Sequence, residues 1–262
     1  MLADPSSAAP PLPPLVAALP PAARELVARH LAVLSSWNSH TNLTAEREPA
    51  ELLERHVADS LALLPVIEGC WAQGRAAGAE GGAAGLPDPA PVPASLSPAP
   101  PSAPALRVLD VGSGAGFPGL SLAAARPHWR VTVMDSRAKR TAFLEEAAKA
   151  MRAEEAGRDP FLSSSFDVVV ARGVAALGPL AELSAPLLEV GGILVAPKGP
   201  DPGAEIAQAQ RAMRVLGMEF LGVFSVESKG PNGLRTAVVL RKTQETPPEF
   251  PRENGDAQRH PL

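Results

Sequence analysis

The sequence predicts an α/β fold in which a mostly parallel sheet follows a small N-terminal helical module. Three observations carry this prediction. Apolar runs of strand length alternate with helical patterns beyond residue 105, the N-terminal part shows amphipathic helical patterns, and an Ala/Gly/Pro-rich stretch separates the two. The chain is therefore expected to comprise a helical module (1–72), a flexible insertion (73–105) and a sheet-containing domain (106–262).

The helical module predicts two amphipathic helices. Residues 21–37 carry apolar side chains at helical spacing, and Pro21 suits the first turn because an amide hydrogen is not needed there. Thr44 comes shortly before the second helix, and we expect it to cap that helix ahead of Arg47 and Glu48. The apolar stripe of the second helix comprises Leu52, Leu53, Val57, Leu61 and Leu64.

The insertion is recognised by composition alone. From about residue 74 to 104 the sequence consists largely of Ala, Gly and Pro, with almost no large apolar side chain to bury. We expect a flexible linker with locally extended backbone at its prolines.

The third region alternates strands and helices. Apolar runs predict parallel strands at 106–111, 131–135, 166–171 and 191–199. Helical patterns lie near 118–126, 138–152, 178–189 and 203–216. Two last runs, 218–227 and 235–241, flank a Gly-Pro-Asn-Gly turn and predict an antiparallel hairpin at the sheet edge.

Composition excludes several classes of protein. A single cysteine rules out an internal disulfide framework, and the five histidines show no zinc-ligand spacing, so no metal is expected. No run approaches the roughly 18 apolar residues of a membrane span, and the N-terminus lacks a targeting pattern. We expect a cytoplasmic monomer. The net charge of −4 argues only weakly against a nucleic-acid partner, because a local basic stretch lies at 137–152.

A glycine-rich loop follows the first predicted strand of the sheet. Asp110-Val111-Gly112-Ser113-Gly114-Ala115-Gly116 stands where open α/β sheets of the Rossmann type bind nucleotides. The dinucleotide fingerprint requires GxGxxG, but here the third glycine comes one residue early and Phe117 takes the place of the last glycine, which disfavours NAD. The loop instead suits a ligand without a pyrophosphate, and S-adenosylmethionine fits that description. Asp135 ends the second strand, where its carboxylate can accept both ribose hydroxyl hydrogens.

The combination of WN-x-x-x-NLT (37–44), RH-x-x-DS (55–60) and D-x-G-x-G-x-G-F-P-G (110–119) resembles the bacterial 16S ribosomal RNA guanine-N7 methyltransferase G family, also called glucose-inhibited division protein B. Further segments share the resemblance: RAEEAGRDP (152–160), FDVVVARGVAAL (166–177), PKG (197–199) and TPPEFPRENGDAQRHPL (246–262). The resemblance implies a class I methyltransferase sheet, S-adenosylmethionine as cofactor and 16S rRNA of the small ribosomal subunit as partner.

The resemblance also implies roles for single residues. Gly112 and Gly114 of the loop, with Phe117, would line the cofactor pocket. Ala153 and Glu154 would contact the adenine side. Arg172 would end a strand beside the cofactor, and it is the candidate for a catalytic residue. The set of expected cofactor-binding residues is Gly112, Gly114, Phe117, Asp135, Ala153, Glu154 and Arg172.

The N-terminal motif leaves two interpretations open. Its polar side chains could hold the helical module onto the catalytic domain, which we favour, or could shape an RNA-facing cleft. His56 and Ser60 are one helical turn apart and share a face, but we do not expect a Ser-His nucleophile. The residues concerned are Asn42, Arg55, His56, Asp59 and Ser60.

Three departures from the family pattern stand out. Residues 74–104 look inserted, which long loops tolerate. Before Arg152, a strand and its connection, about ten residues, are missing, so that the helix at 138–152 runs almost directly into the segment with Ala153 and Glu154. Gly173 stands where the family usually has alanine.

The expected reaction needs no general base, because guanine N7 already carries a lone pair. Catalysis would come from positioning the reactants, which supplies on the order of 7 to 11 kcal/mol in favourable cases. RNA contacts are expected from Arg137, Lys139, Arg140 and Lys198. The alternatives are a small-molecule methyltransferase, which would share the loop and Asp135, and a non-catalytic RNA- or ribosome-binding relic, which the shortened region before Arg152 would explain.

Overall fold

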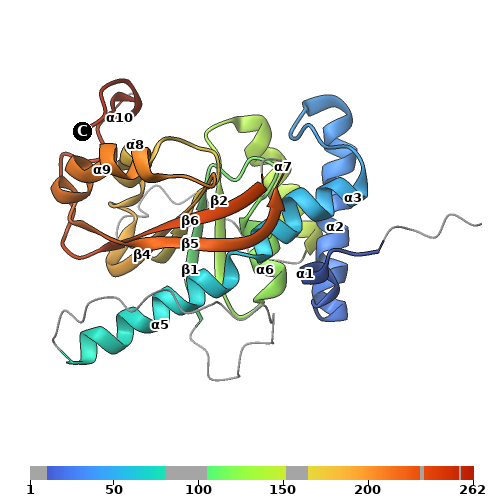
Figure 1. Cartoon of the computed structure of the whole chain (residues 1–262). Coiled ribbons are helices and arrows are strands. Elements are labelled where there is room, and N and C mark those ends of the chain that lie inside the picture. Colours follow the sequence, from blue (N-terminus) through green and yellow to red (C-terminus); the bar gives the residue numbers. More distant parts are fainter. Residues whose placement is uncertain (1–10, 81–104, 152–164, 231–232, 254) are drawn as a thin grey trace, which may run out of the picture.

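The computed structural model describes residues 11–80, 105–151, 165–230, 233–253 and 255–262. A six-stranded sheet in the order β2-β1-β3-β4-β6-β5 forms its centre (Figure 1). Strands β1 to β4 run parallel to one another. Strands β5 and β6 form an antiparallel hairpin, and β6 also pairs with β4 in the antiparallel direction. The strands are β1 (Arg107–Val111), β2 (Arg130–Met134), β3 (Phe166–Val170), β4 (Leu188–Lys198), β5 (Met218–Gly230) and β6 (Gly233–Lys242).

This is the predicted Rossmann-like α/β sheet, with the hairpin at its edge. Among the described residues no strand pairs with the outer edge of β2. Residues 152–164, which include Ala153 and Glu154, lie outside the described part. The helices of the sheet domain are α6 (Gly119–Ala125), α7 (Ala138–Met151), α8 (Leu177–Ser184), α9 (Gly203–Val215) and the short α10 (Asp256–Arg259).

The helical module is more segmented than predicted. Its first long helix is α2, with proline in its first turn as expected. The predicted second helix is divided into short α-segments around a π-helical turn that carries His56. The elements of the module are α1 (Pro14–Ala17), α2 (Pro21–Thr41), α3 (Pro49–Leu52), the π-helix (Leu53–Ala58), α4 (Asp59–Leu61) and α5 (Leu64–Glu80).

One local prediction in this region was wrong. Thr44 does not cap the second helix, because α3 begins after Glu48 with Pro49 in its first turn and no side-chain cap. The Thr44 hydroxyl donates to Glu46 instead. The predicted boundary at residue 72 falls within α5, which continues to Glu80. Alanine has the highest helix propensity, which favours this extension.

Two apolar layers enclose the sheet. Side chains alternate along β1, so that Val108 packs in the layer containing α2, α6 and α7, whereas Leu109 and Val111 pack in the layer containing α8 and α9. The first layer also contains the buried leucines of the helical module, and the module therefore shares one core with the sheet domain. None of the described helices is long and apolar enough to cross a membrane.

Candidate functional site

The glycine loop, Gly112–Gly116, leaves the carboxyl end of β1 and is tied to the neighbouring strand. The amides of Gly112 and Ser113 donate to the carbonyl of Met134 at the end of β2, at 2.9 and 3.0 Å. Gly114 and Gly116 have φ angles of +56° and +88°, a region that side chains disfavour. A Cβ on Gly114 would meet no atom closer than 3.8 Å, so the loop leaves space beside this backbone.

The carboxylate of Asp135 holds the glycine loop directly. Its Oδ2 accepts the amide of Gly114 at 3.0 Å, and its Oδ1 accepts the amide of Arg137 at 3.0 Å. The guanidinium of Arg140 pairs with Oδ2 at 3.3 Å. The Asp135 side chain is only 3% exposed, whereas that of Arg140 is 32% exposed. A ligand hydroxyl could therefore reach this carboxylate if the more exposed Arg140 turned aside.

A second carboxylate, that of Asp110, belongs to β1 just before the loop. Asp110 is fully buried, and its Oδ2 accepts the amide of Gly119 at 2.8 Å. Its Oδ1 has no hydrogen-bond partner among the described residues. Burial raises the pKa of Asp110 to about 6. A buried carboxylate oxygen without a donor is costly, so this atom suits a ligand that brings an N–H or O–H group.

Phe117, directly after the loop, packs against two histidines of the helical module. The ring of His56 stacks on it with 4.9 Å between centroids, and the ring of His30 lies 4.8 Å away at a tilt of 44°. The guanidinium of Arg172 lies 5.7 Å from the Phe117 ring centroid. Phe117 is 3% exposed, so it connects the loop to the module through apolar contact.

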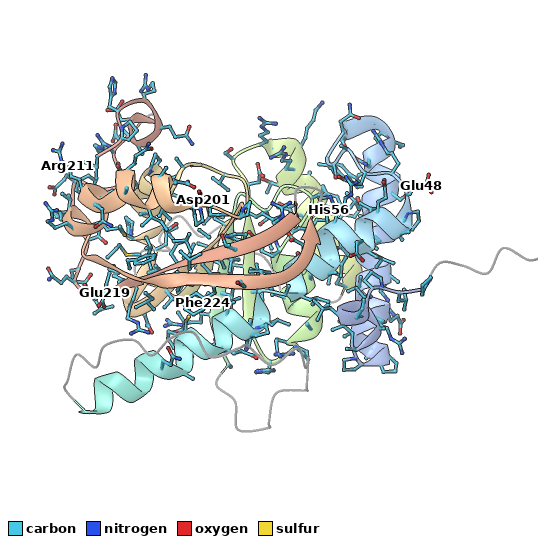
Figure 2. All side chains as sticks on the ribbon, in the orientation of Figure 1. Glu48, His56, Asp201, Arg211, Glu219 and Phe224 are labelled. Atoms are coloured by element: carbon cyan, nitrogen blue, oxygen red, sulfur yellow. The ribbon has the colours of Figure 1, made fainter. Side chains whose placement is uncertain are left out.

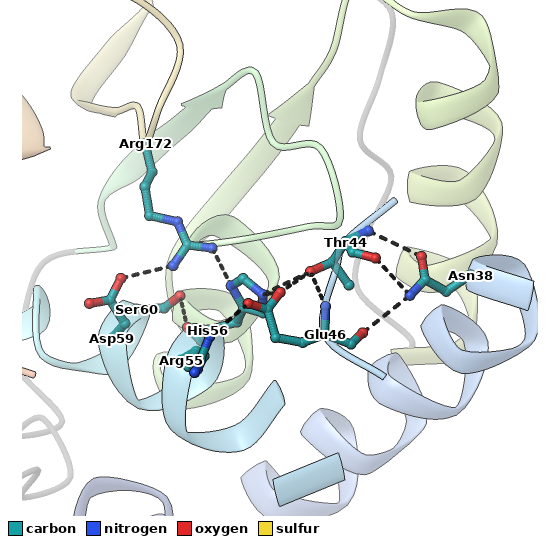
Figure 3. A network of polar contacts seen from close by, with 8 residues as sticks. All are labelled: Asn38, Thr44, Glu46, Arg55, His56, Asp59, Ser60 and Arg172. Carbon is teal, nitrogen blue, oxygen red and sulfur yellow. Dashed lines mark hydrogen bonds and ion pairs between the residues drawn. The ribbon is translucent and has the colours of Figure 1, made fainter. Parts of the chain in front are cut away.

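A polar network joins the helical module to the end of β3 (Figure 3). Arg172, which follows β3, donates to Asp59 Oδ2 at 2.8 Å and to His56 Nδ1 at 3.0 Å. Because Nδ1 accepts this hydrogen bond, His56 carries its proton on Nε2 and donates it to Glu46 at 3.0 Å. Burial, aided by the Arg172 charge, lowers the pKa of His56. The imidazole is therefore neutral between a cation and an anion.

The remaining members of the N-terminal motif bind within the module. The hydrogen bond from Thr44 lowers the pKa of Glu46 to about 2, so Glu46 is ionised. Arg55 pairs with Glu46 at 3.4 Å, and Ser60 donates to the carbonyl of His56. Asn42 accepts from Arg47 at 2.7 Å. The favoured interpretation, in which the motif holds the module onto the sheet domain, is therefore supported by the contacts of Asp59 and His56 with Arg172.

Comparison with known proteins identifies the family. The chain matches the family described as rRNA small subunit methyltransferase G over residues 23–87 and 94–233. The chain belongs to this family.

Relatives cover almost its whole length. Ribosomal RNA small subunit methyltransferase G of Symbiobacterium thermophilum is 35% identical over 257 residues, which are 92% of this chain and 91% of that protein. The protein of the same name from Roseiflexus castenholzii is 36% identical over 248 residues, 91% of each chain. The family match spans the glycine loop, Asp135 and the network around Arg172, so the whole described site lies within the methyltransferase family region.

Five of the seven cofactor-binding residues expected from the sequence lie in the described structure. Gly114 is bonded to Asp135 and Gly112 to the preceding residue, Met134, while the Arg172 guanidinium lies 5.7 Å from the Phe117 ring centroid. Ala153 and Glu154 fall outside the described residues. Gly173 has a φ of +67°, which glycine adopts without strain and which gives a backbone reason for the departure from alanine.

The four expected RNA contacts differ in their surroundings. Arg137 and Lys139 are exposed at the start of α7, close to Asp135. Arg140 is turned toward Asp135. Lys198 is 13% exposed and bound to Glu205 at 2.5 Å and to the carbonyl of Ala175 at 3.1 Å. Lys198 is therefore the candidate least free to reach an RNA phosphate.

Sequence reasoning missed one residue that contacts the glycine loop. His30 belongs to the apolar stripe of α2, and its Nε2 lies 2.8 Å from the carbonyl oxygen of Ala115, 85 residues away. Its position in a helical stripe signals burial but does not show what it contacts. The described residues contain no group of three or more His, Cys, Asp and Glu side chains arranged to hold a metal ion.

Proposed function

We propose that this chain transfers the methyl group of S-adenosylmethionine to N7 of a guanine in 16S rRNA of the small ribosomal subunit. The observation that carries the proposal is the hydrogen bond between Asp135 and Gly114, which joins the glycine loop and the carboxylate of the second strand in one ligand-binding unit. Membership of a family of rRNA methyltransferases gives the proposal its substrate class.

The residues of this unit fit the donor. The amino-acid end of S-adenosylmethionine would lie along Gly112 and Gly114, and its ammonium would supply the donor that Asp110 Oδ1 lacks. Asp135 would accept the ribose hydroxyls. Within the described part of the chain, Oδ1 of Asp135 accepts one hydrogen bond, from the amide of Arg137, and displacement of Arg140 would free a position on Oδ2. When bound, the sulfonium of the donor supplies an electrophilic methyl group.

The protein's own contribution to the reaction is positioning. Guanine N7 is already nucleophilic, so no proton has to be removed before it attacks. The two histidines nearest the loop are engaged elsewhere: His30 binds the carbonyl of Ala115, and His56 lies between Arg172 and Glu46. Neither is arranged as a base, which agrees with catalysis by holding the reactants in line.

Recognition of the guanine must leave N7 free. A hydrogen bond to N7 would block the attack, so selection would use O6, the ring faces and the phosphates. Arg137 and Lys139 are exposed next to Asp135 and are suited to phosphate contacts at the mouth of the site. A guanine in structured RNA would also have to be turned out of its stack, at a cost of a few kcal/mol.

The proposal is tested by transfer of a radiolabelled methyl group from S-adenosylmethionine to purified small ribosomal subunits. Asp135→Ala should abolish transfer and donor binding, because it removes the ribose acceptor and the anchor of Gly114. The matched control is Glu219→Ala, which removes an exposed carboxylate on β5, far from His56 in Figure 2. This control should retain wild-type transfer.

The outcomes distinguish the alternatives. Donor binding by the wild type without transfer to RNA would contradict the rRNA substrate and favour a small-molecule methyltransferase. No donor binding at all would favour the non-catalytic relic.

A further inference from the structure

We propose that His30 of α2 is a positioning residue that holds the glycine loop in the shape that binds the methyl donor. The helical module would then be part of the donor site and not only an appendage to it. This inference rests on the proposed function and extends it to a residue outside the sheet domain.

His30 touches three consecutive residues of the loop region. Its Nε2 lies 2.8 Å from the Ala115 carbonyl oxygen, and its ring packs 4.8 Å from that of Phe117. A Cβ on Gly116 would lie 2.8 Å from the same Nε2 atom. The imidazole therefore fills the space that a side chain at position 116 would need, and the absence of that side chain lets the helix and the loop approach.

The hydrogen bond has a defined direction. A backbone carbonyl only accepts, so the proton of His30 must be on Nε2. The side chain is 1% exposed, and burial lowers the pKa of His30 to about 4, which keeps the ring neutral at pH 7. The bond is thus a neutral N–H to carbonyl contact shielded from water.

The position of His30 favours a role in placing the loop over a role in packing alone. Leu34, one turn further along α2, is fully buried in the same core layer, so the helix already contributes leucine to that layer. Burying an imidazole costs free energy unless its polar atoms are bonded. The partner found is the backbone between Gly114 and Gly116, two residues with positive φ. Glycine has more backbone freedom than any other residue, so Gly114 and Gly116 leave the loop flexible. The hydrogen bond to Ala115 therefore restricts the backbone conformations of this loop.

The consequence for binding follows from the population of the binding-competent loop. The apparent dissociation constant rises in inverse proportion to the fraction of molecules in that shape. Loss of one buried hydrogen bond shifts such an equilibrium by about tenfold. We therefore expect His30→Leu to weaken donor binding about tenfold, with the affinity for RNA unchanged.

Rescue by a conservative variant separates positioning from packing. A glutamine Nε2 can occupy nearly the place of the imidazole Nε2 and donate to Ala115, so His30→Gln should bind the donor within about threefold of wild type. An asparagine is too short to reach, so His30→Asn should resemble His30→Leu. Leu34→Ala is the matched control, because it removes buried side-chain volume from the same helix and a leucine side chain donates no hydrogen bond to the loop.

The experiment is calorimetric titration of the full chain with S-adenosylmethionine, together with RNA binding and thermal unfolding of each variant. The inference is supported if donor affinity falls in His30→Leu and His30→Asn and is retained in His30→Gln and Leu34→Ala. It is overturned if His30→Leu binds the donor like wild type, or if Leu34→Ala loses as much affinity. Should His30→Leu not fold, the contrast between His30→Asn and His30→Gln decides.

The proposed function fails in a different way. A wild-type protein that binds no donor contradicts the methyltransferase proposal. A wild-type protein that binds the donor, with every His30 variant equally tight, contradicts only the positioning role.

Discussion

The buried imidazole of His30 predicts a specific loss of stability in acid. Burial disfavours the charged ring and lowers the pKa of His30 from the ordinary histidine value of 6.5 to about 4 in the folded protein. Between these values the unfolded chain binds the proton and the folded chain does not. The free energy of unfolding should therefore be fully retained above pH 6.5 and fall as the pH drops toward 4.

The loss in the free energy of unfolding can be calculated from the lowered pKa of His30. About 2.5 pKa units correspond to roughly 3 kcal/mol, of which about 2 kcal/mol is already lost at pH 5. Asp110 acts in the opposite direction, because its raised pKa of about 6 lets the folded state bind a proton first as the pH falls. The total stability of the wild type will thus change less than either group alone would require.

The difference between wild type and His30→Gln isolates the histidine. Glutamine does not titrate, so urea unfolding at pH 8 and pH 5 should show the wild type losing about 2 kcal/mol more than the variant over this range. Equal losses in the two proteins would refute the reasoning, because a histidine that remains accessible to protons in the folded state contributes no such difference.

Three further predictions follow from individual contacts. Gly116→Ala should lower the free energy of unfolding, measured with urea, more than Gly191→Ala does. Both glycines have φ near +90°, where an alanine costs about 1 to 2 kcal/mol in backbone strain. Only at position 116 would the new Cβ also lie within 3 Å of other side chains. Arg172→Ala should lower the free energy of unfolding by about 2 kcal/mol in the same assay, because the buried carboxylate of Asp59 loses its partner at 2.8 Å and keeps Arg235 at 3.9 Å; unchanged stability would argue against the network. Arg137→Gln should reduce the salt dependence of RNA binding by about 0.7 in log–log slope, whereas Lys198→Gln should leave it unchanged; equal effects would contradict the assignment of Lys198 to an internal ion pair.

The sheet was predictable because its signals are local. The apolar run at 168–171 favours a strand that is buried on both faces, and β3 is buried along its whole length. Helix and strand limits were less predictable. The helix expected at 178–189 ends at Ser184, and β4 begins at Leu188 because Leu188 pairs with Phe166, a contact that periodicity does not reveal.

Sequence spacing indicates which candidate residues lie together only where those residues follow adjacent strands. The glycine loop and Asp135 follow adjacent parallel strands, so the topology brings them together. His30 lies on a helix 85 residues before its partner, and its pattern is that of any buried apolar stripe. The contact depends on how the module packs against the sheet, which long-range structure alone determines.

The central claim is that this chain methylates N7 of a guanine in 16S rRNA. The most direct measurement is mass spectrometric mapping of methylated guanines in 16S rRNA from cells with and without the protein. Our account predicts a 7-methylguanosine that is present with the wild-type protein, absent without it and not restored by Asp135→Ala. An identical set of methylated guanines in both kinds of cell would contradict the account.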